Sequence, residues 1–247
     1  MKPTIHSIAF LLCCAFTFFS CSQDSSVAPA QSTGQGGSMA RFAVAGDVLY
    51  TVDDTKVNIF NIADPAHPKM KDVFELGTGI ETIFPYQDKL FIGSQNGMYI
   101  LDIQNQEHPQ LLSTYEHIVS CDPVVTDGRY AYITLNAENF CRGINELQVV
   151  DLANINAPKL ISQYAMTGPK GLGIDQNILF VCDDGLKMYD ASNVKSLQLK
   201  QHFKISAYDV IPMNGHLLVV GKDGLYQYRY TQNALELLSK IDVQPAL

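Results

Sequence analysis

The sequence contains no tryptophan, no run of more than two basic residues, and no short motif that marks a common catalytic or metal site. HExxH, GxSxG, CxxC and a phosphate-binding glycine loop are all absent, so the enzyme classes recognised by these motifs have no support here. Binding of nucleic acid needs clustered Lys and Arg, and the net charge of −8 argues against that partner. Without tryptophan, any platform for sugar stacking would consist of Tyr or Phe.

Helical periodicity is also missing. After the N-terminal region, no segment repeats apolar residues at a helical period over ten residues. A chain of 247 residues that is 47% hydrophobic can bury one sizeable core, and all-β domains of this length are often single. We therefore expect one all-β domain.

Residues 1–20 predict an export signal. Lys2 precedes an apolar run of twelve residues, Ile8–Phe19, which is typical of a signal peptide but shorter than the roughly 20 residues of a membrane-spanning helix. The run ends in Phe18-Phe19-Ser20-Cys21, which resembles a bacterial lipobox with Phe where Leu is usual. This resemblance implies that Cys21 is lipidated. The alternative is a plain secretory signal that happens to contain a cysteine.

Residues 21–38 predict a flexible tether. After Cys21 they are rich in Ser, Gln, Gly and Ala and lack apolar periodicity. A tether between a lipid anchor and a domain lets the domain stand clear of the head groups. Ser22 and Gln23 place no acidic residue beside the anchor, which favours the outer membrane of the cell envelope. Whether the domain faces the periplasm or the outside stays open.

Residues 39–247 contain five copies of one unit, spaced by about 40 residues and by 48 across the third. Their second strands are LYTV from Leu49, LFIG from Leu90, AYIT from Ala131, LFVC from Leu179 and LLVV from Leu217. Their third strands are VNIFNI from Val57, MYILDI from Met98, LQVVDL from Leu147, LKMYDA from Leu186 and LYQYRY from Leu225. A polar corner, usually with proline, follows each third strand and precedes an outer strand.

Glycines support hairpins between the second and third strands. Gln95-Asn96-Gly97, Asp183-Asp184-Gly185 and Lys222-Asp223-Gly224 are turn sequences in which glycine is expected to adopt a positive φ. Four strands in about 40 residues, with no helix, are typical of a β-propeller blade. We predict a five-bladed β-propeller with repeats at about 39–78, 79–119, 120–167, 168–205 and 206–247. Because no blade is shared between the two ends of the chain, we expect closure by side-chain packing between units one and five.

The third strands resemble the LVIVD repeat, a short bacterial repeat of the propeller type. LQVVDL from Leu147 is the nearest copy and YILDI from Tyr99 the next, and Tyr208-Asp209-Val210 matches the start of a unit. The third-strand Asp is replaced by Asn61 in the first unit and by Arg229 in the fifth. The resemblance implies a propeller on a secreted or surface protein, and it brings no catalytic motif.

A ring of equivalent positions predicts where a ligand binds. The loops leading into the inner strands and the hairpins between the second and third strands open on one face of a propeller, which we call the loop face. Nine residues before each second strand lie Ala40, Glu81, Asp122, Lys170 and Tyr208. Their carboxylates, ammonium and phenol would surround the channel mouth. The alternative is that they are solvated loop residues, or that Lys170 pairs with a neighbouring carboxylate.

Oxygen-bearing side chains on the loop-face hairpins suit calcium, which takes six to eight oxygen ligands. They are Asp53, Asp54, Gln95, Asn96, Asn136, Glu138, Asn139, Asp183, Asp184 and Asp223. No Asp-x-Asp-x-Asp spacing occurs and Asp-Asp-Gly is also ordinary turn chemistry, so we expect no cofactor and keep calcium as the alternative. The histidines show no metal-binding spacing.

The third unit carries an insertion, residues 136–143. Extra loop on a repeat scaffold often lies on the binding face, which makes Asn139 and Arg142 candidate ligand-binding residues. An oxidising compartment makes a Cys121–Cys141 disulfide plausible, and Cys182 would then be a free buried thiol. The alternative leaves all three thiols reduced.

Three functional hypotheses follow. The sequence favours a non-catalytic binding module on a lipid tether, whose partner is an envelope protein or a glycan. Its candidate ligand-binding residues are Glu81, Asp122, Lys170, Tyr208, Asn139, Arg142 and Asp183. The second hypothesis is a glycan hydrolase or lyase that uses Glu81 and Asp122 as paired carboxylates. The third is a purely structural envelope component.

Overall fold

The computed structural model describes residues 36–116, 123–137 and 144–243, which all belong to one compact unit, residues 32–247. Among the described residues, twenty strands form five four-stranded antiparallel sheets, and each sheet takes its strands in chain order. These sheets are the blades of a five-bladed β-propeller, which confirms the predicted fold class.

The blades are numbered in chain order, and each occupies one stretch of sequence. Blade 1 consists of β1 (Phe42–Ala45), β2 (Val48–Val52), β3 (Lys56–Asn61) and β4 (Lys69–Glu75). Blade 2 consists of β5 (Ile80–Tyr86), β6 (Lys89–Ser94), β7 (Gly97–Asp102) and β8 (Gln110–Glu116). Blade 3 consists of β9 (Val124–Thr126), β10 (Tyr130–Leu135), β11 (Glu146–Asp151) and β12 (Lys159–Ala165).

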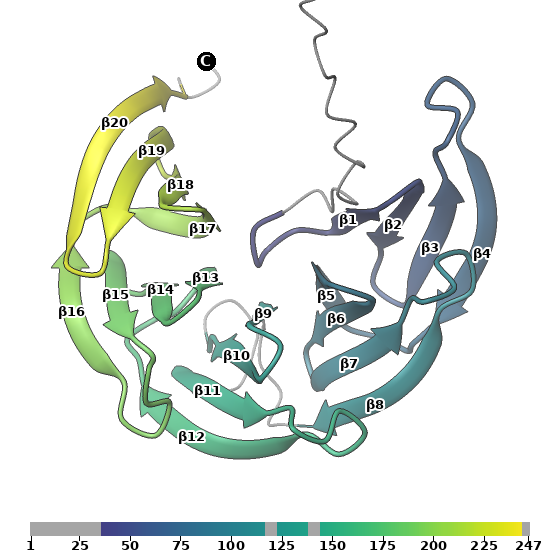
Figure 1. The fold of residues 1–247 in the computed structure, drawn as a ribbon, viewed down its shortest axis with the longest axis horizontal. Coiled ribbons are helices and arrows are strands. Elements are labelled where there is room, and N and C mark those ends of the chain that lie inside the picture. Colours follow the sequence, from purple (N-terminus) through teal and green to yellow (C-terminus); the bar gives the residue numbers. More distant parts are fainter. Residues whose placement is uncertain (1–35, 117–122, 138–143, 244–247) are drawn as a thin grey trace, which may run out of the picture. The chain divides into compact units, whose positions relative to one another are not determined.

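The last two blades follow the same pattern. Blade 4 consists of β13 (Leu172–Asp175), β14 (Ile178–Cys182), β15 (Leu186–Asp190) and β16 (Gln198–Phe203). Blade 5 consists of β17 (Ala207–Met213), β18 (His216–Gly221), β19 (Gly224–Thr231) and β20 (Ala234–Asp242). In Figure 1 the first strand of each blade is innermost and the fourth is outermost. The described residues include no helix that could cross a membrane.

The hairpin glycines are required mainly by crowding. Gly97 and Gly185 have positive φ, as predicted, but Gly224 does not. A Cβ on Gly97, Gly185 or Gly224 would lie 2.0, 2.4 or 2.3 Å from a backbone carbonyl oxygen of the neighbouring fourth strand. Glycine therefore recurs at this position because the outer strand passes too close for any side chain.

In blades 2 to 4, alternating residues of the second strand pack on the two neighbouring blades, because successive side chains of a strand point to opposite faces. Leu90 of blade 2 packs against blade 1, together with Tyr50 and Ile59. The next residue, Phe91, points to the opposite face and belongs to the core shared with blade 3. This alternation makes the four junctions between consecutive blades the core of the domain.

A hydrogen bond at the periphery of each junction supplements the apolar packing. In all four, a side chain of one blade donates to a backbone carbonyl in the corner between the third and fourth strands of the next. The pairs are Tyr50–Gln106 at 2.7 Å, Ser113–Ile155 at 2.6 Å, Tyr164–Val194 at 2.7 Å and Gln201–Asn233 at 3.1 Å. Among the described residues, no side chain of blade 5 donates to the corresponding corner of blade 1.

The first and fifth blades are linked by polar contacts. Ser38 is buried, its hydroxyl donates to Asp209 Oδ1 of β17 at 2.8 Å, and the Met39 N–H donates to Asp209 Oδ2 at 3.2 Å. The Ser38 hydroxyl also accepts from the Leu172 N–H at 2.8 Å. A Cβ on Gly37 would lie 2.0 Å from Asp209 Oδ2, so a side chain at this position would displace the carboxylate.

This link differs from the predicted closure. Side-chain packing between units one and five was expected, yet within the described residues no apolar cluster joins blade 1 to blade 5. Ser38, assigned from sequence to the tether, is instead a buried part of the domain. The reason is that residues 37–41 reach inward from β1 to β17, and their polar contacts connect the ends of the blade series (Figure 1).

Candidate functional site between blades 4 and 5

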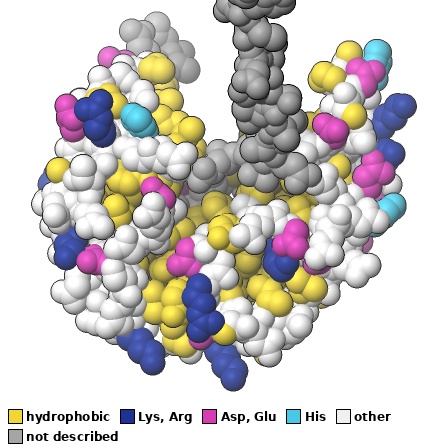
Figure 2. Space-filling view, viewed as in Figure 1, with side chains coloured by type: hydrophobic (Ala, Val, Ile, Leu, Met, Phe, Trp, Pro, Cys, Tyr) yellow, Lys and Arg dark blue, Asp and Glu magenta, His cyan; other side chains and the backbone are white. Residues whose placement is uncertain are grey.

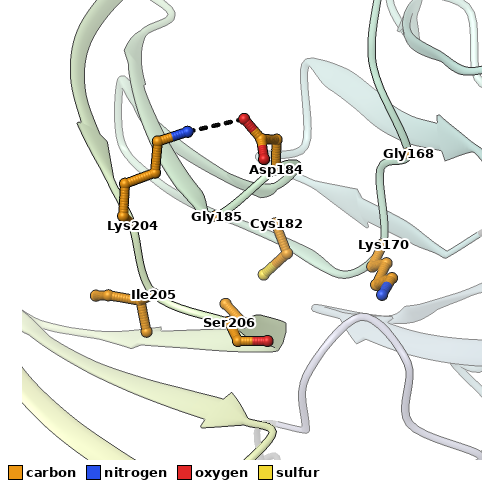
Figure 3. Close-up of a pocket in the computed structure, with 9 residues that line it drawn as sticks. Gly168, Lys170, Cys182, Asp184, Gly185, Lys204, Ile205 and Ser206 are labelled. Atoms are coloured by element: carbon orange, nitrogen blue, oxygen red, sulfur yellow. Dashed lines mark hydrogen bonds and ion pairs between the residues drawn. The ribbon is translucent and has the colours of Figure 1, made fainter.

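A pocket of about 350 Å³ opens on the loop face between blades 4 and 5. Three segments form it: the loop into β13, the hairpin between β14 and β15, and the loop into β17. Its lining residues include Lys170, Cys182, Asp184, Lys204 and Ser206, and Figure 3 shows them around the cavity. The volume lies in the range of small-molecule sites, which is about 300–1,000 Å³.

The backbone holds Lys170 at the edge of this pocket. Its N–H donates to the Cys182 carbonyl at 2.8 Å, and its carbonyl accepts from Thr134 Oγ1 of blade 3 at 2.6 Å. The Lys170 ammonium lies 5.1 Å from the centroid of the Tyr208 ring, which is a cation–π distance. Lys170 and Tyr208, which are two of the five equivalent positions in the predicted ring, are thus in contact.

The Lys170 ammonium has no ion-pair partner in the part of the chain that the structure describes. The neighbouring cations differ: Lys204 pairs with Asp184 at 2.8 Å, and Lys187 pairs with Asp183 at 2.6 Å. The hydrogen bond from Lys204 lowers the pKa of the Asp184 carboxyl, which keeps it ionised. Lys170 therefore brings to the edge of the pocket a positive charge that forms no ion pair with a described carboxylate.

Cys182 lines the pocket with a free thiol that is only 1% exposed, as expected for this residue. Burial raises the pKa of this thiol well above its ordinary value, and the nearby Asp209 carboxylate raises it further. Since the thiolate is the nucleophilic form, Cys182 at neutral pH is unsuited to nucleophilic attack.

Asp183 organises the loop beside the pocket. Its side chain is fully buried, and Oδ1 accepts from the N–H groups of Thr167 and Gly168 at 3.0 and 2.8 Å. Together with the ion pair to Lys187, these bonds occupy the carboxylate. Asp183 was predicted to bind a ligand, and in this structure it anchors the loop that leads to Lys170.

Glu81 lies at the corresponding place in blade 2. Gln95 Nε2 donates to Glu81 Oε1 at 3.2 Å, which joins the start of β5 to the hairpin between β6 and β7. Other hairpin carboxylates carry turn contacts: Asp53 accepts from the Thr55 N–H at 2.9 Å, and Asp223 accepts from the Tyr226 hydroxyl at 2.5 Å. Asn136 donates to the Pro169 carbonyl at 2.6 Å.

Several predicted residues lie outside the described residues. They are the lipidation candidate Cys21, the disulfide candidates Cys121 and Cys141, and the ligand-binding candidates Asp122, Asn139 and Arg142. The distance between the carboxylates of Glu81 and Asp122, which the enzyme hypothesis pairs, is therefore not defined by the described residues. In the described ranges, no group of three or more His, Cys, Asp or Glu side chains is placed to hold a metal ion.

Sequence reasoning missed Asp209 as a member of this region. It was noted only within Tyr208-Asp209-Val210, yet its buried carboxylate lies against Gly171, the residue after Lys170, and holds Ser38. Burial raises its pKa, while hydrogen bonds from Ser38 and the Met39 and Val210 N–H groups lower it. Its position directly after Tyr208, a predicted ring residue, was the available signal.

Comparisons with known proteins agree with this architecture. Residues 87–117 match the family model of the LVIVD repeat, so the predicted resemblance is confirmed for blade 2, although the copy in blade 3 had seemed nearest by sequence. No curated protein matches the chain significantly.

Three solved structures share the propeller fold at low sequence identity. A Lactobacillus plantarum protein matches with a TM-score of 0.64 and 14% identity, over 80% of this chain and 73% of its own. A putative 6-phosphogluconolactonase of Bacteroides fragilis gives 0.64 and 13%, over 82% and 69%. A periplasmic gluconolactonase of Pseudomonas aeruginosa gives 0.61 and 13%, over 80% and 68%. The chain therefore contains an LVIVD repeat and folds as a β-propeller.

Proposed function

We propose that this chain is an envelope lipoprotein, tethered through Cys21 to the outer membrane, whose propeller is a non-catalytic binding module. The pocket between blades 4 and 5 takes a small polar ligand that carries an anionic group. The observation that supports this proposal is the Lys170 ammonium, which lies at a pocket of about 350 Å³ without a carboxylate partner among the described residues.

The surroundings of Lys170 suit an anion. A carboxylate or phosphate entering the pocket would gain a charge-assisted hydrogen bond from the ammonium, and such bonds are roughly twice as strong as neutral ones. The Lys204–Asp184 pair leaves no net negative charge at the opposite wall. The exposed Ser206 provides a hydroxyl for a second polar contact.

Sugar acids are suitable probes because they combine one carboxylate with several hydroxyls. Saturation-transfer NMR on the full chain in detergent, with D-gluconate and uncharged D-glucose, tests the proposal. We expect signals from gluconate only, and their loss in Lys170→Met. Lys195→Met, which removes an exposed cation from a corner of blade 4, is the matched control and should retain them. Equal signals from gluconate and glucose, or an unchanged Lys170→Met variant, would refute the proposed pocket.

An enzyme that acts on a sugar derivative is the second candidate, because two propellers of the same fold are named gluconolactonases. In that case Glu81 would act on the substrate, since it is the one of the two predicted catalytic carboxylates that lies among the described residues. Hydrolysis of δ-gluconolactone, followed by acid release, separates the two functions. Under the binding proposal we expect the uncatalysed rate. A rate above it that falls in Glu81→Gln would favour the enzyme.

Localisation needs its own test. We expect metabolic labelling with a lipid analogue to mark the full chain at Cys21, and Cys21→Ala to abolish both the label and recovery in the membrane fraction. Release of the unlabelled wild-type protein into the soluble fraction would favour a plain secretory signal.

A further inference from the structure

The carboxylate of Asp209 lies between two pieces of backbone that come from opposite ends of the blade series. Asp209 is only 8% exposed. A Cβ on Gly37 would lie 2.0 Å from its Oδ2, and a Cβ on Gly171 would lie 2.2 Å from its Oδ1. Gly37 begins residues 37–41, which we call the strap, and Gly171 belongs to the loop into β13. Both segments therefore touch the same buried carboxylate.

The loop into β13 connects this carboxylate to the pocket. Lys170, at the edge of the pocket, directly precedes Gly171, whose N–H donates to the Tyr208 carbonyl at 2.9 Å. The next residue, Leu172, donates its N–H to the Ser38 hydroxyl at 2.8 Å. Three consecutive residues thus contact the pocket, blade 5 and the strap in turn, so a change at the strap acts on the backbone that carries Lys170.

Hydrogen bonds from the strap hold the Asp209 carboxylate. The Ser38 hydroxyl donates to Oδ1 at 2.8 Å and the Met39 N–H donates to Oδ2 at 3.2 Å. A further bond comes from the Val210 N–H on the same strand as Asp209, at 2.9 Å. Without the strap, the carboxylate would keep the bond from Val210 and lose those from Ser38 and Met39. A buried carboxylate left in this way is strongly destabilising unless it finds another partner.

Lys170 is the cation that can become this partner. Charged side chains of the domain are often paired, and Figure 2 shows Lys and Arg next to Asp and Glu at several places around the blades. The Lys170 ammonium has no such pair within the described ranges, and it lies 5.1 Å from the ring centroid of Tyr208, the residue before Asp209. Asp209 raises the pKa of the Cys182 thiol and Lys170 lowers it, so both charges lie near the same thiol.

We propose that the strap regulates the pocket by occupying Asp209. While Ser38 and Met39 hold the carboxylate, the Lys170 ammonium is available to an anionic ligand. When the strap is displaced, Asp209 and Lys170 form an ion pair and the pocket no longer attracts an anion. This inference rests on the proposed function, in which Lys170 binds the anionic group of the ligand. Because coupling between two sites is reciprocal, a bound anion also favours the docked strap.

Gluconate binding to the full chain in detergent tests this regulation. An NMR titration of Ser38→Ala should give a dissociation constant about fivefold or more above that of the wild type, as is typical of coupled sites. Adding Asp209→Asn to this variant removes the competing charge and should restore the affinity. Ser239→Ala, which removes an exposed hydroxyl from blade 5, is the control and should bind as the wild type does. An unchanged Ser38→Ala variant, or a loss that Asp209→Asn does not restore, would overturn the proposal.

Amine labelling tests the ion pair without a ligand and without the double variant. Trace acetylation with acetic anhydride, followed by mass spectrometry of peptides, gives the rate at Lys170 relative to the exposed Lys195. A carboxylate partner stabilises the unreactive ammonium form, so Ser38→Ala should slow the reaction of Lys170 and Ser239→Ala should not. Equal rates in Ser38→Ala and the wild type would overturn the proposal even where gluconate binds. If the wild type binds no gluconate, the proposed ligand fails, whereas a slower Lys170 in Ser38→Ala still supports control by the strap.

Discussion

Blades 2 to 5 each pack on a preceding blade, whereas blade 1 has no described blade before it, and equivalent residues behave differently in consequence. His108 in the corner of blade 2 reaches Asp72 of blade 1 across the junction, with Nδ1 and Oδ2 3.0 Å apart. His67, at the equivalent corner of blade 1, contacts Asp64 of its own corner at 2.9 Å. The same repeat unit therefore produces an inter-blade contact or a local one, depending only on whether a neighbour is present.

This comparison shows where the stability of the domain lies. A packed junction combines buried aliphatic and aromatic residues from two blades with a hydrogen bond at its periphery. The ends of the series keep the apolar pattern but gain little from it, since hydrophobic stabilisation scales with the area removed from water, at about 25 cal/mol per Å². Four predictions test the contrast.

The largest effect is expected from truncating two equivalent leucines. One lies at the junction of blades 1 and 2, and the other lies on the free face of blade 1, which no described blade covers. Leu90→Ala should lower the free energy of unfolding by about 3 kcal/mol, because it leaves a cavity where the leucine is completely buried. Leu49→Ala, at the half-buried equivalent in blade 1, should cost about 1 kcal/mol. Urea unfolding measures both values. Equal losses would mean that the free face is covered as well as the junction.

The polar link between residues 37–41 and blade 5 should have the next largest effect. Ser38→Ala removes the donor to Asp209 and the acceptor of the Leu172 N–H, so we expect a loss of about 2 kcal/mol. Hydrogen exchange should accelerate at β17 and at the Leu172 amide in particular. Ser239→Ala, whose exposed hydroxyl bonds Gln227 on the surface, is the control. Unchanged exchange at β17 would show that the link does not hold the two ends together.

The hydrogen bonds at the junction peripheries should contribute less. Tyr164→Phe removes a donor to the Val194 carbonyl and an acceptor for the Leu197 N–H, and should cost about 1 kcal/mol. In Tyr99→Phe, no hydrogen bond to a described residue is lost, so the free energy of unfolding should change by only a few tenths of a kcal/mol. If the two substitutions have the same effect in urea unfolding, the peripheral bond does not stabilise the junction.

The smallest effect concerns pH. The hydrogen bond from His108 is the main cause that lowers the pKa of the Asp72 carboxyl, followed by that from the Val73 N–H. A carboxyl with a lower pKa in the folded state stabilises the fold above its ordinary pKa, and this contribution is lost as the pH falls through the folded value. His108→Gln should therefore reduce the loss of stability on acidification from pH 5 to pH 3. His67→Gln affects no junction, so its free energy of unfolding should fall between pH 5 and pH 3 as steeply as that of the wild type.

Much of the fold was predictable because the same pattern of alternating apolar residues and turn residues occurs five times in the sequence. A single stretch such as LFIGSQNGMYILDI is ambiguous, but five copies with the same alternation and turns determine strand order and blade number. The hairpin glycines were correctly located, although crowding by the outer strand explains them better than a positive φ, as Gly224 shows. That crowding involves carbonyl oxygens 17 or 18 residues away in the sequence, so local turn chemistry could not reveal it.

The candidate site was predictable only in part. Equivalent positions in the repeat brought Lys170 and Tyr208 to the same place, and the structure adds that the ammonium lies over the ring. Asp183 is on the same hairpin as predicted, but its carboxylate is occupied by backbone N–H groups and Lys187. Pattern alone indicates which face a side chain occupies, whereas its partners depend on loops from neighbouring blades.

The sequence by itself determined the all-β class, the five units and the approximate positions of the second and third strands, because these follow from alternation, turn residues and repeat length within about 40 residues. Only the tertiary structure decided how the two ends meet, that Ser38 is buried against Asp209, and that Cys182 and Lys170 line one pocket. These features join residues up to 171 positions apart. Such contacts depend on how the blades are placed in space, and no local pattern of apolar and polar residues encodes that placement.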